Sequence, residues 1–202
     1  MLDLEGRTIL VTGASKGIGA AVARALGAQG ASVIAHYRGD AAGARDATAG
    51  ISAERRLLVR ANLDQPGAAA KLWADALSWH GRINVLVNNA AVMPFKGGIY
   101  DADEAWEDAW ARSWQVNVKA PADLMREAVK HFRAQSGGIL ITVSSWVAQR
   151  GSTNPATIAY AASKAATMAA TKTVARAYAK DNVLWLVFSF GPEQAEIFEK
   201  LP

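Results

Sequence analysis

Continuous apolar runs alternate along this chain with stretches of helical periodicity, and this alternation restricts the possible folds strongly. The apolar runs, each bounded by turn residues, are Arg7–Val11, Ser32–Tyr37, Arg55–Arg60, Ile83–Val87, Gly138–Ser144 and Val183–Ser189. The helical patterns between them cover Gly17–Gln29, Asp40–Ile51, Pro66–Trp79, Asp103–His131 and Thr157–Lys180. Strands that are buried on both faces have unbroken apolar sequences, and intervening helices imply parallel pairing. The pattern predicts a doubly wound parallel sheet with three α/β/α layers, and a long helix bent at Pro121.

Length and composition favour one globular domain over residues 1–202. Of these residues 51% are hydrophobic and 20% are charged, which suits a sizeable core. The sequence contains no run of about 18 uncharged apolar residues that would predict a membrane span. Acidic Asp3 and Glu5 stand where a signal peptide would have basic residues, and the chain has no cysteine, so we expect a reducing cytoplasm. The net charge of +4 is spread along the chain, which favours anionic small molecules over nucleic acid as partners.

A glycine-rich turn, Thr12–Gly19, follows the first predicted strand and precedes the first helix. Glycine permits a tight turn and the close approach of a ligand, and a helix N-terminus offers free N–H groups and a positive dipole end. In doubly wound sheets this position binds the pyrophosphate of a dinucleotide. The candidate cofactor contacts in the turn are Gly13, Ser15, Lys16, Gly17, Ile18 and Gly19.

The end of the second strand bears on the choice between NAD and NADP. An acidic side chain at this position binds the ribose hydroxyls of NAD, whereas an arginine accommodates the 2′-phosphate of NADP. This chain has Arg38 here, with Lys16 in the neighbouring turn, and Asp40 is the remaining argument for NAD. We therefore expect NADP(H) to be preferred over NAD(H).

Tyr160 and Lys164 lie four positions apart at the start of the last predicted helix, so they are neighbours on one helix face. This spacing alone fits either an ordinary surface pair or a catalytic pair. In a catalytic pair the ammonium would favour the phenolate and lower the phenol pKa from about 10, which would make Tyr160 a better proton donor and acceptor near neutral pH.

Five short motifs occur in order along the chain: TGASKGIG at 12–19, NNAA at 88–91, Asn117, Ser144-Ser145, and YAASK at 160–164. With this combination the chain resembles the classical short-chain dehydrogenases/reductases over about residues 4–180. The resemblance implies a single Rossmann domain that carries both the cofactor site and the catalytic site.

The resemblance also implies four catalytic residues. Tyr160 would be the acid/base, and Lys164 would bind the nicotinamide ribose and hold its ammonium near the phenol. Ser145 would hydrogen-bond the substrate oxygen, and Asn117 would anchor the water of a proton relay. Ser145 precedes Tyr160 by 15 positions, about two more than is common in the family, so Ser144 is an alternative to Ser145.

Further cofactor contacts follow from the same resemblance. Asn88 and Ala90 would lie along the cofactor, and Asn62 and Leu63 would flank the adenine. Asn62 stands where the family usually has an aspartate.

The C-terminal part departs from the family pattern. Leu186 and Phe190 replace the asparagine and proline that usually end the next strand, and Ala195 stands where a threonine often contacts the cofactor. The family continues beyond Pro202 through a substrate lid and a further strand, so the fold is expected to be shortened here: the chain is either a short member or incomplete at this end.

Two other features concern metals and assembly. The three histidines have no ligand spacing, so no metal site is expected. Asp101 and Glu104 resemble a helix-capping pair. Trp106, Trp110 and Trp114 recur on one face of the long helix, and family members dimerise at helices in this position, so we expect a homodimer.

Taken with the resemblance, the motifs predict an oxidoreductase that transfers a hydride between NADP(H) and a small-molecule carbonyl or alcohol, with Tyr160 as acid/base. The alternative is an NADP(H)-binding protein of the same fold with little turnover, because its C-terminal nicotinamide clamp and lid are altered.

Overall fold

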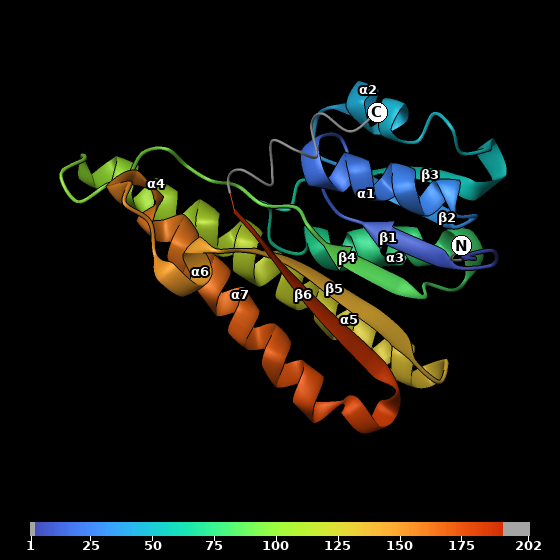
Figure 1. The fold of residues 1–202 in the computed structure, drawn as a ribbon. Coiled ribbons are helices and arrows are strands. Elements are labelled where there is room, and N and C mark those ends of the chain that lie inside the picture. Colours follow the sequence, from blue (N-terminus) through green and yellow to red (C-terminus); the bar gives the residue numbers. More distant parts are fainter. Residues whose placement is uncertain (1–2, 192–202) are drawn as a thin grey trace.

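A computed structural model describes residues 3–191, and its centre is a six-stranded sheet in which every strand pairs in parallel with its neighbours (Figure 1). The strand order is β3-β2-β1-β4-β5-β6, so the order reverses between β1 and β4. This arrangement confirms the predicted doubly wound sheet. The strands are β1 (Thr8–Val11), β2 (Ser32–Tyr37), β3 (Arg56–Arg60), β4 (Val85–Asn88), β5 (Gly138–Ser145) and β6 (Val183–Phe190).

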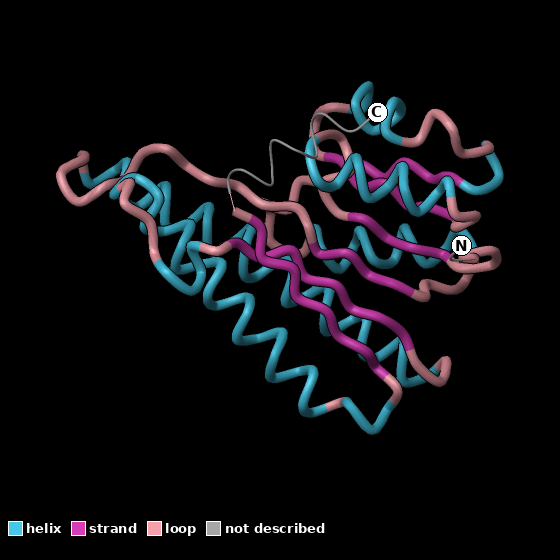
Figure 2. The backbone as a smooth tube through the Cα atoms, viewed as in Figure 1, coloured by secondary structure: helices cyan, strands magenta, loops and turns pink. Residues whose placement is uncertain are grey.

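Helices cover both faces of the sheet and complete the three layers (Figure 2). One face carries α1 (Gly17–Ala28) and α2 (Ala41–Ala47). The other carries α3 (Ala68–His80), α5 (Ala120–Ala134) and α7 (Ile158–Ala177), with α4 (Asp103–Trp114) leading into α5. The shorter elements are α6 (Val147–Arg150), a π-helical segment (Gln115–Lys119) and single 3-10 turns at Ala53–Arg55, Pro155–Thr157 and Ala179–Asp181. No helix of the described residues is long and apolar enough to cross a membrane.

Successive residues of each strand point into opposite layers, which creates one core on each face of the sheet. Leu10 and Leu86 pack with Phe132 of α5 in the core beneath α3, α5 and α7. Val11 of the same strand packs with Ala23 of α1 in the core on the other face. The unbroken apolar strands predicted from the sequence are explained by this burial on both sides.

The long helix predicted over 103–131 is interrupted before the expected bend at Pro121. The segment Gln115–Lys119 is π-helical, so the interruption begins six residues earlier than Pro121 itself. Proline has no N–H and cannot donate to the carbonyl four positions back, which is that of Asn117. The hydroxyl of Thr167 in α7 donates to this carbonyl instead. The irregular turn therefore attaches Asn117 to α7.

Two local expectations were wrong. The helix expected over Asp40–Ile51 is the shorter α2, and α6 was not predicted at all. Asp101 does not cap α4, because its Oδ2 accepts hydrogen bonds from the backbone N–H groups of Gly97 and Gly98 at 2.7 and 2.8 Å. Local competition for backbone donors decides such caps, and the sequence pattern alone does not reveal it.

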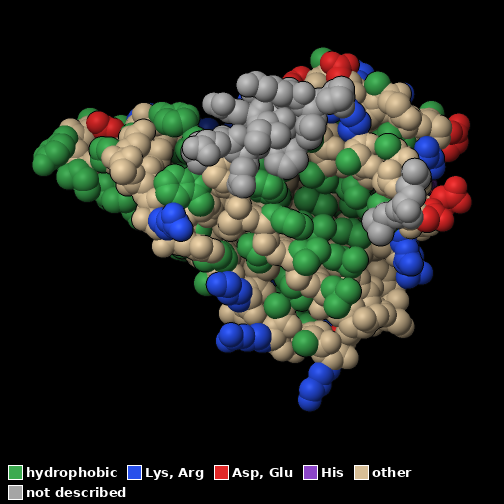
Figure 3. Space-filling model, viewed as in Figure 1, with side chains coloured by type: hydrophobic (Ala, Val, Ile, Leu, Met, Phe, Trp, Pro, Cys, Tyr) green, Lys and Arg blue, Asp and Glu red, His purple; other side chains and the backbone are tan. Residues whose placement is uncertain are grey.

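The outer strand β6 has an exposed apolar face. Leu184, Leu186 and Phe188 alternate along it and are 57%, 48% and 46% exposed. They lie on the face of the sheet that carries α1, as do their partners Ile139 and Ile141 in β5. No helix of residues 3–191 packs over β5 and β6 on this face (Figure 1), and hydrophobic side chains gather there in the space-filling view (Figure 3). Trp185, on the opposite side of the same strand, packs against the core beneath α5 and α7.

Candidate active site

The candidate site lies at the carboxyl ends of the strands, where the strand order reverses between β1 and β4. Loops that leave two neighbouring strands in opposite directions open a crevice at such a point, and ligands of open α/β sheets bind there. The glycine turn leaves β1 at this crevice, and residues 89–92 leave β4 beside it.

The glycine turn has a backbone that other residues would not tolerate. Gly13 has φ +69° and Gly17 has φ +54°, in the left-handed region that favours glycine. A Cβ atom on Gly19 would collide with the carbonyl oxygen of Gly13 and the side-chain amide of Asn89. The start of α1 therefore lies against the turn, with Lys16 at its N-cap, no side-chain cap and no acidic residue in its first turn.

Hydrogen bonds from the end of β4 hold this turn. The Asn89 side-chain amide donates to the carbonyls of Thr12 and Gly13 at 2.8 and 3.1 Å. The Thr12 hydroxyl accepts from the N–H groups of Asn89 and Ala90 at 2.9 and 3.0 Å and donates to the carbonyl of Val87. The two walls of the crevice are thereby joined directly.

His36 at the end of β2 holds the turn from the other side. Its Nδ1 accepts the N–H of Gly13 at 3.1 Å, and its Nε2 lies 3.1 Å from the carbonyl of Ala61. Only 2% of the residue is exposed, and burial lowers the pKa of His36 to about 4. The ring is therefore neutral at neutral pH.

Positive side chains lie around the end of β2, whereas Asp40, the acidic residue that would favour NAD, is hydrogen-bonded at the start of α2. Arg38 and Lys16 are exposed, and Arg60 donates to the carbonyl of Arg38 at 3.2 Å. The carboxylate of Asp40 accepts from the N–H of Gly43 at 2.8 Å and caps α2. Its backbone carbonyl accepts from the hydroxyl of Ser15 at 2.8 Å.

The residues expected along the adenine and the cofactor lie at the same edge of the sheet, with different exposure. Asn62 is exposed just beyond β3, and Leu63 beside it is 5% exposed. The Asn88 side chain is buried and donates to the carbonyl of Pro121 at 3.4 Å, so it points away from the crevice. Ala90 approaches the glycine turn, since a Cβ on Gly13 would lie 3.0 Å from its Cα atom.

Asn117 connects three segments near the start of α7. Its side-chain amide donates to the carbonyl of Val92 at 2.8 Å and to the hydroxyl of Ser163 at 3.0 Å. Its Oδ1 accepts the N–H of Val92 at 2.8 Å. These hydrogen bonds attach the Asn117 side chain to the segment that follows β4 and to α7, the helix that carries Tyr160 and Lys164.

Lys164 is buried beneath Tyr160 on α7. Its Nζ donates to the carbonyl of Val143 at 2.8 Å and lies 5.8 Å from the centroid of the Tyr160 ring. Only 6% of the residue is exposed, and burial lowers the pKa of Lys164 to about 8. The pair is therefore not an ordinary surface pair.

The pKa of Tyr160 is raised by burial, and a hydrogen bond with the Ser145 side chain opposes the shift. The expected lowering of the Tyr160 pKa by Lys164 is not seen: burial is the largest cause of the shift, and only the Ser145 side chain opposes it. Ser145, rather than Ser144, is thus the serine beside the phenol. The Ser144 hydroxyl is buried, and no partner for it is found among the described residues.

The structure brings together most of the residues expected from the sequence and adds others. The turn is held by Asn89 and His36, and Asn117 is held by Ser163 and Thr167. Asn89 stands within the NNAA motif and could have been found there. Ser163 likewise stands within the YAASK motif, whereas His36 and Thr167 have no sequence signal of their own, because their partners are 23 and 50 positions away along the chain.

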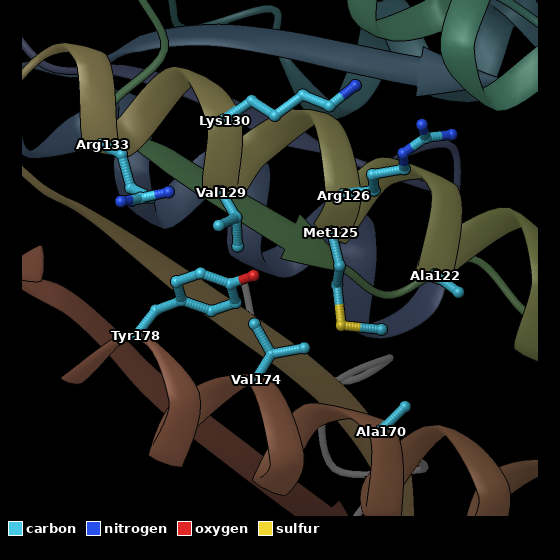
Figure 4. A pocket seen from close by; sticks show the side chains of 9 residues that line it. All are labelled: Ala122, Met125, Arg126, Val129, Lys130, Arg133, Ala170, Val174 and Tyr178. Carbon is cyan, nitrogen blue, oxygen red and sulfur yellow. The ribbon is translucent and has the colours of Figure 1, made fainter.

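A separate cavity of about 390 Å³ lies between α5 and α7, well away from Tyr160 (Figure 4). Its α7 residues run from Ala170 to Tyr178, whereas Tyr160 is in the first turn of that helix. Met125, Val129 and Val174 are among its apolar lining. The basic residues of its lining are Arg126, Lys130 and Arg133. No group of three or more metal-ligating side chains occurs among the residues that the structure describes.

Comparison with known proteins gives consistent matches. The family model described as short chain dehydrogenase matches residues 7–201. The 3beta-hydroxysteroid dehydrogenase 1 of Eggerthella lenta is 34% identical over 190 residues, which cover 90% of this chain and 68% of that protein. The curated relatives are longer: this and two further alignments cover between 58% and 68% of the relative.

Two solved structures show the same architecture. The angucycline C-6 ketoreductase LanV with bound NADP has a TM-score of 0.80 at 31% identity, covering 93% of this chain and 73% of that one. The 3-ketoacyl-(acyl-carrier-protein) reductase of Brucella melitensis complexed with NADH has a TM-score of 0.82 at 27% identity. The match covers 94% of this chain and 77% of that one.

We expect Lys164→Met to raise the free energy of unfolding at pH 7. Burial depresses the folded-state pKa of Lys164 from 10.5 to about 8, so the charged lysine destabilises the fold by about 3 kcal/mol below pH 8. Loss of the bond to Val143 offsets about 1 kcal/mol of the gain. Urea unfolding by circular dichroism measures the difference, which should shrink as the pH rises from 8 toward 10.5.

Lys172→Met is the matched control, because Lys172 is an exposed lysine of the same helix. It should change the free energy of unfolding by less than about 0.5 kcal/mol. A Lys164→Met protein that is less stable than the parent at pH 7 would contradict the prediction.

Proposed function

Because this chain belongs to the short-chain dehydrogenase family, we propose that it is an oxidoreductase that transfers a hydride between NADP(H) and a carbonyl or alcohol group. The observation that carries the proposal is that the Lys164 ammonium lies 5.8 Å from the centroid of the Tyr160 ring, while the Ser145 side chain, at the end of β5 next to β4, is hydrogen-bonded to the phenol. One domain would thus hold both the cofactor and the reacting group. The matched relatives are longer than this chain, and their individual substrates differ from one another.

The residues of the crevice fit a nicotinamide dinucleotide. A Cβ on Gly13 or Gly19 would crowd the turn, so these glycines keep it tight, whereas nothing lies within 4 Å of the place of a Cβ on Gly17, where the backbone is open to a ligand. The uncapped start of α1 offers N–H groups and the positive end of the helix dipole to a pyrophosphate. The bound cofactor would supply the hydride, and the protein would supply position and electrostatics.

Tyr160 is proposed to give its proton to the carbonyl oxygen during reduction. Burial keeps the phenol protonated at neutral pH, which is the form that a general acid requires. Ser145 would donate a hydrogen bond to the same oxygen as negative charge develops on it. Lys164 would hold the cofactor ribose and favour the phenolate that remains, and Asn117 would hold a water for the return of the proton.

NADP(H) is proposed as the preferred cofactor. Arg38 and Lys16 are exposed at the end of β2, and both could contact a 2′-phosphate. Asp40, the remaining argument for NAD, is occupied as the cap of α2. Four of the similar structures bear NADP and one bears NADH, so the family as such does not decide the preference.

Arg38→Asp should reverse or remove a preference for NADP(H). Replacing the guanidinium by a carboxylate removes a charge-assisted contact and repels the 2′-phosphate. We expect the ratio of NADH to NADPH dissociation constants, measured by nicotinamide fluorescence, to fall about tenfold or more. Arg176→Asp, an exposed arginine of α7, is the control and should leave the ratio unchanged. Equal affinities for both cofactors in the parent protein would refute the proposed preference.

Tyr160→Phe should abolish carbonyl reduction while leaving the affinity for NADPH nearly unchanged. The ring and its packing remain, whereas the transferable proton is lost, which reduces the rate by about two to four powers of ten. The assay follows NADPH oxidation with a broad panel of ketones. Tyr100→Phe, at a fully exposed tyrosine, is the matched control.

Two outcomes of this assay would change the conclusion. Full activity of Tyr160→Phe would show that Tyr160 is not the acid. A parent protein that binds NADPH but reduces none of the ketones would favour the alternative, a binding protein with little turnover. Leu186 and Phe190, two of the substitutions behind that alternative, lie in β6, and Ala195 lies outside the described residues.

The protein is further proposed to form a homodimer. Trp114, at the end of the tryptophan stripe, is 50% exposed, while Trp106 and Trp110 pack against each other with ring centroids 5.6 Å apart. The cavity between α5 and α7, which forms a groove at the surface, adds the partly buried Val174 as an apolar contact. Both features would bury apolar surface in a helix-to-helix contact.

Sedimentation velocity at micromolar concentration should show a dimer. Val174→Arg places a charge in the α5–α7 groove and should shift the protein toward monomer. Thr173→Arg, at the neighbouring exposed position of α7, should leave the dimer intact. A parent protein that sediments only as a monomer would count against the proposal.

A further inference from the structure

We propose that His36 positions the glycine turn for cofactor binding, by accepting the N–H of Gly13 on Nδ1 while its Nε2–H donates to the carbonyl of Ala61. This proposal rests on the proposed function, since it concerns the same nicotinamide dinucleotide. His36 does not reach the reacting atoms, so it is a positioning residue and not a catalytic one.

The two hydrogen bonds of His36 determine which of its ring nitrogens carries the hydrogen. A backbone N–H can only donate, so Nδ1 of His36, 3.1 Å from the nitrogen of Gly13, must be the unprotonated acceptor. A carbonyl oxygen can only accept, so Nε2, 3.1 Å from the oxygen of Ala61, must carry the hydrogen. Both partners are satisfied only by the neutral ring with its hydrogen on Nε2. A second proton would break the bond to Gly13.

His36 links three strand ends that the ligand would touch. Gly13 follows β1, Ala61 follows β3, and His36 itself lies near the end of β2. The carbonyl of His36 also accepts the N–H of Ala14 at 2.9 Å, so the turn is bonded to both the side chain and the backbone of one residue. Leu or Phe could fill the same buried space, but neither could accept from Gly13.

The position of Gly13 is transmitted to α1. The carbonyl oxygen of Gly13 lies against Gly19, where no Cβ would fit, so a shift of Gly13 must move the first turn of α1. That turn presents the N–H groups proposed to bind the pyrophosphate. Asn89 restrains the carbonyl side of Gly13, and His36 restrains its N–H side. The two restraints are complementary, because each acts on a different group of the same glycine.

The charged groups around His36 do not account for its neutrality. Titratable side chains on the segments packed around it are Lys16 in the glycine turn, Tyr37 and Arg38 on β2, Arg60 at the end of β3, and Asp64 in the loop that follows. The pKa of His36 is lowered by burial, and the bond to Ala61 acts in the opposite direction. Its neutral state is therefore a consequence of packing between β1 and β3.

Three substitutions of His36 distinguish the effect of its hydrogen bond to Gly13 from the effect of filling the buried space. In His36→Asn the amide oxygen can take the place of Nδ1 and accept from Gly13. In His36→Gln the longer amide can reach the carbonyl of Ala61 instead, and His36→Leu fills space without any hydrogen bond. We expect the dissociation constant for NADP⁺, measured by calorimetry at pH 7.5, to stay within about threefold of the parent for Asn and to rise about tenfold for Leu.

The Gln variant should resemble Leu in affinity, because it restores the bond to Ala61 and not the bond to Gly13. Thermal unfolding of each variant establishes that the protein used for titration is folded. A Leu variant that binds NADP⁺ within twofold of the parent would overturn the proposal, as would an Asn variant that is weakened as much as Leu.

A second measurement needs no ligand. Long-range ¹H–¹⁵N spectra at pH 7 should show His36 with its hydrogen on Nε2, and the Gly13 amide resonance should move on acidification with a midpoint near that of the ring. In His36→Asn this movement of Gly13 should be absent. A hydrogen on Nδ1 at pH 7, or a Gly13 amide that does not respond, would overturn the proposal.

The two proposals fail in different ways. A parent protein that binds no nicotinamide dinucleotide overturns the proposed function and with it the role of His36 in binding, whatever the spectra show. A parent that binds NADP⁺ alongside a Leu variant that binds equally well overturns the inference about His36 alone.

Discussion

The hydrogen-bonded contact between the glycine turn and the end of β4 is the constraint on which the rest of the site depends. Asn89 holds the carbonyls of Thr12 and Gly13, and the Thr12 hydroxyl returns bonds to the β4 side. The loops that follow β1 and β4 leave the sheet in opposite directions, and these side-chain contacts join them across the crevice. The two walls of the crevice are consequently hydrogen-bonded to each other in the fold itself.

The part of the site proposed to be catalytic is held together by another feature, an irregular turn in a long helix. Pro121 cannot satisfy the carbonyl of Asn117, and Thr167 of α7 takes over that role. The same turn presents the Asn117 side chain to Val92 and Ser163. A local defect in one helix thus fixes the distance between that helix, the extension of β4 and α7.

Burial of ionisable groups is the common energetic feature of the site. Lys164 and Tyr160 are both disfavoured in their charged forms by desolvation, and the pKa values of the two groups move apart as a result, that of the lysine downward and that of the tyrosine upward. Such an arrangement destabilises the folded protein locally, which is usual where a residue is kept for chemistry and not for packing. The bond from Lys164 to the carbonyl of Val143 holds the ammonium in place against this cost.

The alternation of apolar runs and helical patterns determined the parallel sheet by itself, because strands covered on both faces cannot alternate with polar residues. Short motifs such as TGASKGIG and YAASK likewise determined where the turn and the Tyr160–Lys164 pair would be, since each lies within a few consecutive residues. Only the tertiary structure decided the direction of the Tyr160 pKa shift, which of the two serines lies beside the phenol, and the hydrogen bonds that His36 and Thr167 make. These depend on burial and on partners far away in the chain, which local sequence patterns do not encode.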